Sequence, residues 1–195
     1  MNSTQPLILA SNSPRRQELL KQAGFLFDVV VKDFDEDFPA SLNAREVAEY
    51  LAVQKNRFYR LFLENEIIIT ADTTVICDEQ VLNKPENVDQ AKTMLRLLSN
   101  NSHQVVSGVC ISSPDQEVHF SDTTEVRFAK LTDEEIDFYI SRFKPYDKAG
   151  SYGIQEWIGL ARIESIVGSY FTVMGLPTHR VYEELTQRFG LTASF

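Results

Sequence analysis

A short apolar run followed at once by a helix start is the feature that most constrains how this chain can fold. Residues 7–10 read Leu-Ile-Leu-Ala, a pattern typical of a buried strand. Ser13 then suits a helix N-cap, and Pro14 suits the first helical residue, where its missing N–H costs nothing. A buried strand that runs directly into a helix indicates an α/β chain.

This helix start carries positive side chains. Arg15 and Arg16 fall in the expected first turn, although the helix dipole already makes that end positive. Together with Ser11, Ser13 and free backbone N–H groups, their guanidinium groups suit a bound phosphate. The alternative is a solvated arginine pair on an ordinary amphipathic helix. These residues alone leave both interpretations open.

Length, composition and charge limit the class of protein. With 195 residues, 43% hydrophobic and 24% charged, the chain suits one soluble domain, or one domain with two lobes. Its formal net charge of −9 argues against a general nucleic-acid binder, which presents a basic surface. A small polyanionic substrate stays possible, because local cations and a bound metal can reverse the field inside one cleft.

The cysteines and the apolar segments indicate a cellular location. Cys77 and Cys110 each lie in an apolar, β-like run, and we expect buried thiols in a reducing compartment, neither a disulfide nor a metal pair. The sequence shows no charged-then-apolar leader and no apolar stretch approaching ~20 residues, so we expect neither secretion nor a membrane span. These features predict a cytoplasmic protein.

Strand-like and helix-like segments alternate along the chain. We expect strands at residues 7–10, 27–31, 66–71, 73–77, 103–113, 117–129, 162–167 and 171–174. We expect helices at residues 14–23, 43–63, 87–98, 132–143 and 177–189, with a polar, glycine-containing loop at 144–159. The strands outnumber those of a plain βαβ array, and hairpins are evident, so the pattern predicts an α/β fold with a mixed sheet flanked by helices.

One carboxylate stands at the end of an isoleucine-rich strand. Asp72 follows this strand and precedes Thr73 and Thr74, whose hydroxyls are suited to binding a substrate. The alternative is an Asx-type turn. The acidic run at residues 33–37 is typical of a solvated loop. However, Asp72 and one acid of that run would suit Mg²⁺, which takes one or two carboxylates together with phosphate oxygens.

The lysines are individually ambiguous. Lys84 is held extended by the proline after it, Lys55 lies inside a long helix and Lys148 lies in the glycine-containing loop. Each taken singly is more often a surface lysine. The sequence has no Walker loop, no dinucleotide-type glycine pattern and no nucleophile elbow, and its three histidines are too dispersed for a zinc cluster.

Several motifs stand in a fixed order along the chain. They are SNSPRRQELL at 11–20, FDED at 34–37, AEYLAVQK at 48–55, ADTTV at 71–75, NKP at 83–85, SGV at 107–109, DKAGSYGIQ at 147–155 and GSYFTVMGLP at 168–177. In this order they resemble the Maf family, the septum-formation-associated nucleotide pyrophosphatases. The resemblance runs nearly end to end, and the ordered set is far more specific than any single motif.

The resemblance implies a metal-dependent enzyme that cleaves nucleoside triphosphates between the α- and β-phosphates. The DKAGSYGIQ segment is similar to the branch that acts on dTTP and UTP. The implied fold is a mixed, elongated central sheet flanked by helices that form two lobes with a cleft between them, in a single domain of residues 1–195. The resemblance also implies a divalent cation, Mg²⁺ or Mn²⁺, and a homodimer. Two alternatives stay open. One is a nucleotide-binding regulator of cell division with incidental turnover, and the other is a hydrolase of modified pyrimidine nucleotides.

The resemblance assigns roles residue by residue. By motif position, Asp72 is the implied proton acceptor, and Glu36 falls on a pocket position. From carboxylate chemistry we also expect Asp72 and Glu36 to hold the metal. The two roles of Asp72 compete, because a carboxylate bound tightly to a metal is a weaker base, and the sequence leaves open which of them dominates. The implied substrate-binding residues are Ser11, Arg15, Arg16, Lys55, Thr73, Lys84 and Gln155. We add Ser13 from the helix start and Lys148, which lies in the DKAGSYGIQ motif. We expect Thr73 and Gln155 to read the pyrimidine edge, because glutamine offers both a donor and an acceptor to O4 and N3–H of uracil or thymine.

The chain departs from the family's usual pattern in four places. Phe34 and Thr74 stand where valine is more frequent, and Asn56 stands where alanine is more frequent. Glu156 stands where glycine usually follows the glutamine, and so places a side chain and a negative charge beside Gln155.

Overall fold

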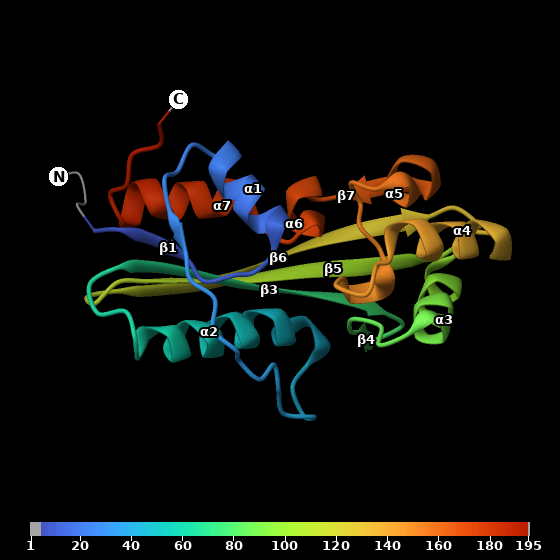
Figure 1. Ribbon diagram of the computed structural model, residues 1–195, viewed down its shortest axis with the longest axis horizontal. Helices are drawn as coiled ribbons and strands as arrows, with labels where there is room; N and C mark the ends of the chain where they lie inside the picture. The colour runs from blue at the N-terminus through green and yellow to red at the C-terminus, as the bar shows by residue number, and fades with distance from the viewer. Residues whose placement is uncertain (1–4, 195) are drawn as a thin grey trace. The chain divides into compact units, whose positions relative to one another are not determined.

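The computed structural model describes residues 5–194, whose elements group into two compact units (Figure 1). The first unit contains the described residues of Met1–Asp72, Ser107–Asp122 and Gly175–Phe195, and the second contains Thr73–Val106 and Thr123–Met174. The strands that pass from one unit into the other along the chain are β3 (Ile67–Cys77), β5 (Ser102–Ser112) and β6 (Glu117–Phe128).

The strands form one mixed sheet, in the order β2-β1-β3-β5-β6-β7, with β4 paired to β3. β1 (Leu7–Leu9) runs parallel to both β2 (Asp28–Val29) and β3. β4 (Gln80–Leu82) is antiparallel to β3, and β7 (Ile163–Val167) is antiparallel to β6. The mixed sheet flanked by helices is therefore confirmed, whereas the cleft between two lobes stays a prediction.

In the first unit, helices cover both faces of the sheet (Figure 1). α1 (Pro14–Gln22) and α7 (Thr178–Glu183) lie on one face, and α2 (Val47–Arg60) lies on the other. α7 continues as a π-helical turn, η3 (Glu184–Arg188). The expected final helix is thus confirmed in position, although its last turn is wider than an α-helix.

α2 packs unusually close to the sheet. A Cβ atom on Gly108 of β5 would lie 2.3 Å from the carbonyl carbon of Ala48, so only glycine allows this approach. Asn56 then anchors the helix, because its Nδ2 donates to the carbonyls of Ile68 at 3.1 Å and Cys110 at 3.2 Å. These contacts give a structural reason for asparagine where the family more often has alanine, and they fix the rotation of α2.

The second unit has its own apolar core. Side chains of α3 (Val88–Leu98), α4 (Asp133–Phe143) and α5 (Trp157–Arg162) pack with those of the strands. The fully buried members include Leu95, Leu98, Phe128, Ile136, Tyr139 and Ile158. This core holds α4 against the segment that precedes α5.

Most of the expected helix starts are confirmed. Ser13 caps α1 by accepting the Arg16 N–H at 3.5 Å, and Asn87 caps α3. Thr132 and Glu135 form a reciprocal capping box on α4. Asn43 instead caps a short 3₁₀ turn, η1 (Ala44–Glu46), so α2 itself begins only at Val47.

Three expected elements differ in the structure. The expected strands at residues 66–71 and 73–77 are one continuous strand, β3. The expected strand at 171–174 is a helix, α6 (Tyr170–Met174). The expected loop at 144–159 contains a 3₁₀ turn, η2 (Ala149–Ser151), and the start of α5. In α6 the Ser169 carbonyl accepts the Thr172 N–H at 3.1 Å, and the Ser169 N–H donates to Thr124 Oγ1 at 2.9 Å. This tertiary anchor overrides the strand preference of the aromatic and β-branched residues in α6.

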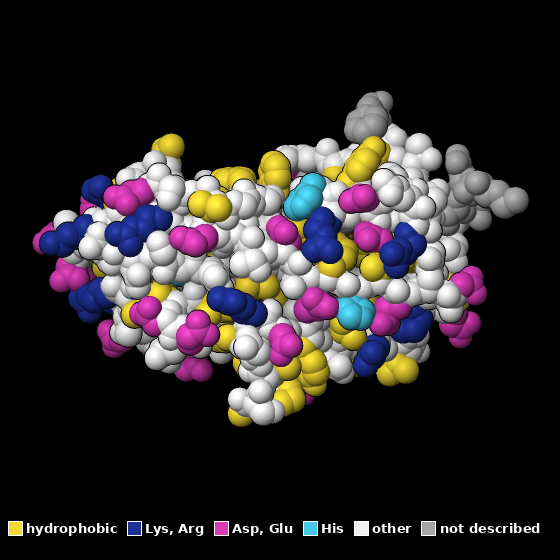
Figure 2. Space-filling model, turned by 180° about the vertical axis from the view of Figure 1, so that it is seen from behind, with side chains coloured by type: hydrophobic (Ala, Val, Ile, Leu, Met, Phe, Trp, Pro, Cys, Tyr) yellow, Lys and Arg dark blue, Asp and Glu magenta, His cyan; other side chains and the backbone are white. Residues whose placement is uncertain are grey.

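Both cysteine side chains lie in the interior. Cys77 and Cys110 are buried, free thiols, as the sequence predicts. Within residues 5–194, no helix combines the length and the apolarity needed to cross a membrane. Figure 2 shows acidic and basic side chains interspersed over the face that it draws.

Candidate functional site

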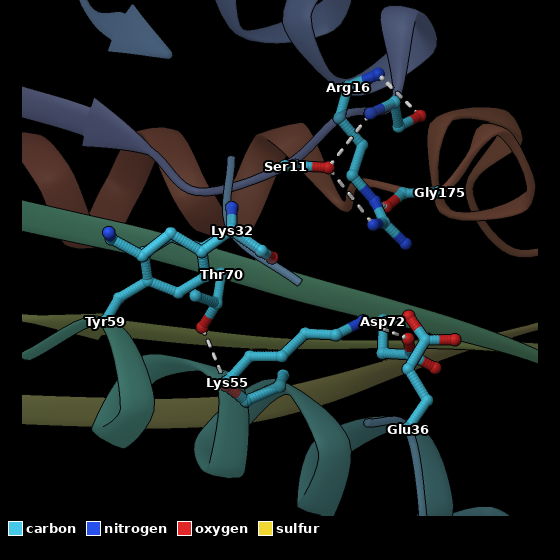
Figure 3. Close-up of polar contacts among 11 residues, drawn as sticks. Ser11, Arg16, Lys32, Glu36, Lys55, Tyr59, Thr70, Asp72 and Gly175 are labelled. Carbon is cyan, nitrogen blue, oxygen red and sulfur yellow. Dashed lines mark hydrogen bonds and ion pairs between the residues drawn. The ribbon is translucent and has the colours of Figure 1, made fainter. Parts of the chain in front are cut away.

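Two carboxylates meet at one ammonium group in the first unit (Figure 3). The Nζ atom of Lys55 lies 2.9 Å from Asp72 Oδ1 and 2.5 Å from Glu36 Oε1. The Lys55 and Asp72 side chains are 12% and 11% exposed, whereas that of Glu36 is 42% exposed. Partial burial of the first two charges strengthens their attraction relative to a fully solvated pair.

The alternation of β3 directs Asp72 toward α2. Thr70, two residues earlier on the same face of the strand, donates its hydroxyl to the carbonyl of Ala52 in α2 at 2.7 Å. Asp72 therefore points to the same helix, where Lys55 lies three residues beyond Ala52 (Figure 3). Because Asp72 lies inside β3, it does not form the Asx-type turn that the sequence left open.

The acidic loop is fastened to α2 by residues that the sequence did not single out. The Lys32 N–H donates to the Tyr59 hydroxyl oxygen at 2.8 Å, and this hydroxyl donates to the Lys32 carbonyl at 3.3 Å (Figure 3). The Phe34 ring lies 5.6 Å from the Phe58 ring, centroid to centroid. Lys55, Phe58 and Tyr59 share one side of α2 at i, i+3 and i+4, a spacing that could have identified them.

The expected side chains of Ser11 and Arg16 meet at the start of α1 (Figure 3). Ser11 Oγ accepts the Ser13 N–H at 3.2 Å and an Arg16 Nη1–H at 3.4 Å. Arg16 Nε donates to the carbonyl of Gly175 at 2.9 Å. Arg15 lies half-buried on the same turn. The hydrogen bonds to Ser11 and Gly175 therefore fix the orientation of the Arg16 guanidinium group.

Arg16 is electrostatically coupled to the carboxylates. Burial lowers the pKa of its guanidinium group, and the charge of Arg15 acts in the same direction. The charges of Asp72 and Glu36 act in the opposite direction and raise that pKa. Arg16, Lys55, Asp72 and Glu36 therefore form one group of opposed charges within the first unit.

The remaining expected residues lie in the second unit. Lys148 is buried between two carboxylates, with Nζ at 2.7 Å from Asp147 Oδ1 and 3.2 Å from Glu156 Oε1. Gln155 is exposed, Lys84 is exposed after β4, and Thr73 is half-buried in β3. Their roles in substrate binding stay predictions.

The donor set suits a hard divalent cation that arrives with phosphate. Among residues 5–194, no group of three or more His, Cys, Asp or Glu side chains is arranged to hold a metal. Asp72 and Glu36, however, both reach the same ammonium group, and their oxygens are donors that Mg²⁺ and Mn²⁺ favour. Mg²⁺ needs only one or two carboxylates when substrate phosphates complete its coordination.

Comparisons with known proteins agree with the resemblance to the Maf family. The family model described as "Maf-like protein" matches residues 6–188. The dTTP/UTP pyrophosphatase of Phocaeicola vulgatus is 51% identical over 181 residues, which cover 92% of this chain and 94% of that protein. The dTTP/UTP pyrophosphatase of Parabacteroides distasonis is 48% identical over 181 residues, with the same shares covered.

A solved structure, the Ham1 protein of Staphylococcus aureus, is similar with a TM-score of 0.48 and 18% identity, over 64% of this chain and 72% of that one. That likeness is too weak to define the fold of this chain. The family model and the sequence relatives, in contrast, span nearly the whole of this chain. This chain belongs to the Maf family.

Proposed function

We propose that this chain hydrolyses dTTP and UTP to the nucleoside monophosphate and diphosphate. The contact of Lys55 with both Asp72 and Glu36 carries the proposal: it supports a general base, metal-binding oxygens and a phosphate-binding cation as the roles of these three side chains. Relatives about half identical to this chain and named dTTP/UTP pyrophosphatase support the substrate class.

Asp72 is assigned as the proton acceptor. Lys55 contacts Oδ1 and so orients the carboxylate that takes the proton of the attacking water. The carboxylate belongs to β3, in which every residue except the half-buried Thr73 is buried, so the surrounding strand fixes its position. A rigid base lowers the entropic cost of aligning water with the α-phosphate.

The positive side chains balance the triphosphate. The ammonium group of Lys55 and the guanidinium group of Arg16 offset the charge that develops on the leaving diphosphate. Ser11 and Ser13 hold the start of α1, whose N–H groups suit phosphate oxygens. Asp72 and Glu36 are the residues that would hold Mg²⁺ or Mn²⁺, and the cation when bound polarises the phosphate that is attacked.

Gln155 in the second unit is assigned to base recognition. Its amide matches both O4 and N3–H of uracil or thymine. Cytosine reverses this donor and acceptor pattern, so it leaves buried groups of the complex unpaired and is disfavoured. Thr73, Lys84 and Lys148 are assigned to substrate binding on the family motifs alone.

The cellular location and the assembly are proposed from the cysteines, the net charge and the family resemblance. We assign the chain to the cytoplasm, because its two buried thiols are free, as in reducing compartments. A homodimer and the absence of nucleic-acid binding rest on the family resemblance and on the net charge of −9. Light scattering of the purified protein would test the homodimer.

The test is to supply each common nucleoside triphosphate with Mg²⁺ and to measure released diphosphate and orthophosphate separately. We expect diphosphate and monophosphate, fastest with UTP and dTTP, and no release after the metal is chelated. Orthophosphate alone would show cleavage at the γ-phosphate and contradict the proposal. If no triphosphate and no metal gave any release, the nucleotide-binding regulator would replace the enzyme.

A further inference from the structure

Glu156, one of the departures from the family pattern, has well-defined partners in the second unit. The hydroxyl of Tyr139 donates to Glu156 Oε2, and Lys148 Nζ lies 3.2 Å from Glu156 Oε1. The Glu156 side chain is 16% exposed. Both of its oxygens are therefore used in contacts that a glycine at this position would lack.

Tyr139 joins α4 to the segment that contains Glu156. Its side chain is fully buried, and its hydroxyl oxygen accepts the Gly153 N–H at 2.9 Å. Burial and then the hydrogen bond to Glu156 raise the pKa of Tyr139, so the phenol stays protonated and acts as a donor. One hydroxyl group thus fixes the backbone at Gly153 and the carboxylate of Glu156 together.

The amide of Gln155 lies against this fixed backbone. A Cβ atom on Gly153 would lie 2.9 Å from Glu156 Cδ and 3.1 Å from Gln155 Nε2. Gly153 therefore leaves room for both side chains, and the Gln155 amide lies beside the Glu156 carboxyl group. A side chain at position 153 would collide with both of them, so the Gly153 backbone, the Glu156 carboxyl group and the Gln155 amide share one small region.

We propose that Tyr139 and Glu156 are positioning residues that hold the Gln155 amide and the Lys148 ammonium group for recognition of the pyrimidine nucleotide. The inference rests on the proposed function, because it assigns the orientation of residues that the proposal uses. The inference gives Glu156 a role. A glycine at this position would leave the backbone freer to move, whereas the Glu156 carboxylate is held by its contacts with Tyr139 and Lys148. Neither Tyr139 nor Glu156 needs to touch the substrate.

A purely structural role makes a different prediction. If Glu156 only balanced the charge of buried Lys148, its loss would lower stability and would slow all nucleotides equally. A positioning role instead changes the ratio of kcat/KM between nucleotides that differ only at the base edge. UTP and CTP form such a pair.

The experiment uses Glu156→Gln, which keeps the shape but removes the charge, and Tyr139→Phe, which removes only the hydroxyl. Glu134→Gln is the matched control, because Glu134 is exposed on the same helix as Tyr139. We expect kcat/KM for UTP to fall about tenfold in either variant, the order of one net hydrogen bond, while that for CTP changes little. The double variant should have the same kcat/KM for UTP as the less active single variant, because both substitutions remove the same contact.

The outcomes separate the two proposals. If the unaltered protein releases no diphosphate from any triphosphate, the proposed function fails and this inference fails with it. In a second outcome, the unaltered protein is active but the ratio of kcat/KM for UTP to that for CTP changes by less than about a factor of two in both variants. In that case only the inference fails. Equal losses for both nucleotides that follow a lower Tm would also overturn it. Glu156→Gln decides alone if Tyr139→Phe does not fold.

Discussion

At the residue scale, a substitution of Asp72 should lower kcat without lowering the thermal stability. Asp72→Asn keeps the size of the side chain, and Lys55 retains its contact with Glu36 at 2.5 Å. We therefore expect a Tm close to that of the unaltered protein. Loss of the base should lower kcat with UTP about 10²–10⁴-fold, the usual contribution of a positioned general base. Steady-state release of diphosphate and thermal unfolding measure the two effects.

Asp37→Asn is the matched control for this substitution. Asp37 is an exposed carboxylate of the acidic loop, one residue after Glu36. It should leave kcat unchanged, because an exposed charge near a site acts mainly through screened, long-range attraction. A near-normal kcat in Asp72→Asn would remove Asp72 from the mechanism.

At the scale of elements, the acidic loop depends on α2 for its position. Tyr59→Phe leaves the N–H and the carbonyl of Lys32 without the hydroxyl that bonds both of them. The loop should then hold Glu36 less firmly near Lys55. We expect the Mg²⁺ concentration for half-maximal activity to rise several-fold, with kcat at saturating Mg²⁺ little changed and with a loss of about 1 kcal/mol in stability. Metal titrations of the hydrolysis rate measure the shift.

Tyr50→Phe controls for removal of a hydroxyl from the same helix. Tyr50 is half-buried on α2, nine residues before Tyr59. This variant should show the metal dependence of the unaltered protein. If Tyr59→Phe shows the same metal dependence as well, the loop does not rely on Tyr59, or Glu36 does not bind the metal.

The elements also show what the sequence can and cannot predict. Caps at Ser13, Asn87 and Thr132 were predictable, because each acts on an N–H within three residues. α6 was not, because its anchor joins Ser169 to Thr124, 45 residues away in the chain. The sequence composition of α6 favours a strand, and only the tertiary contact makes it a helix.

The candidate site divides in the same way. Family motifs named Asp72, Glu36 and Lys55, but their mutual contact depends on how α2 packs on β3 and on Gly108 of β5. The contacts of Tyr59 with Lys32 and of Tyr139 with Glu156 were missed. In both, a tyrosine hydroxyl bonds a loop far along the chain, and no local pattern marks such a pairing.

At the scale of the whole molecule, one buried histidine makes the free energy of unfolding depend on pH. His103 is 2% exposed, and its Nε2 lies 2.7 Å from the Tyr152 hydroxyl oxygen in the second unit. Burial lowers its pKa from 6.5 to about 4. As the pH falls below 6.5, the unfolded chain takes up a proton that the folded chain refuses until about pH 4, so stability is lost between these values. At pH 5 this effect should cost about 2 kcal/mol relative to pH 7.5.

The strands β3, β5 and β6 run through both units. We therefore expect the loss of stability at low pH to affect the whole chain, which should unfold in one cooperative transition. Urea unfolding at both pH values should be followed by fluorescence of Trp157, the single tryptophan, and by far-UV circular dichroism. The two probes should give the same midpoint, and His103→Gln should flatten the pH dependence that the exposed His179→Gln control retains. If circular dichroism reported a later transition than Trp157, the first unit would be stable without the second, and the continuity of the strands would not couple them. If His103→Gln kept the full pH dependence, the acid sensitivity would belong to the carboxylates instead.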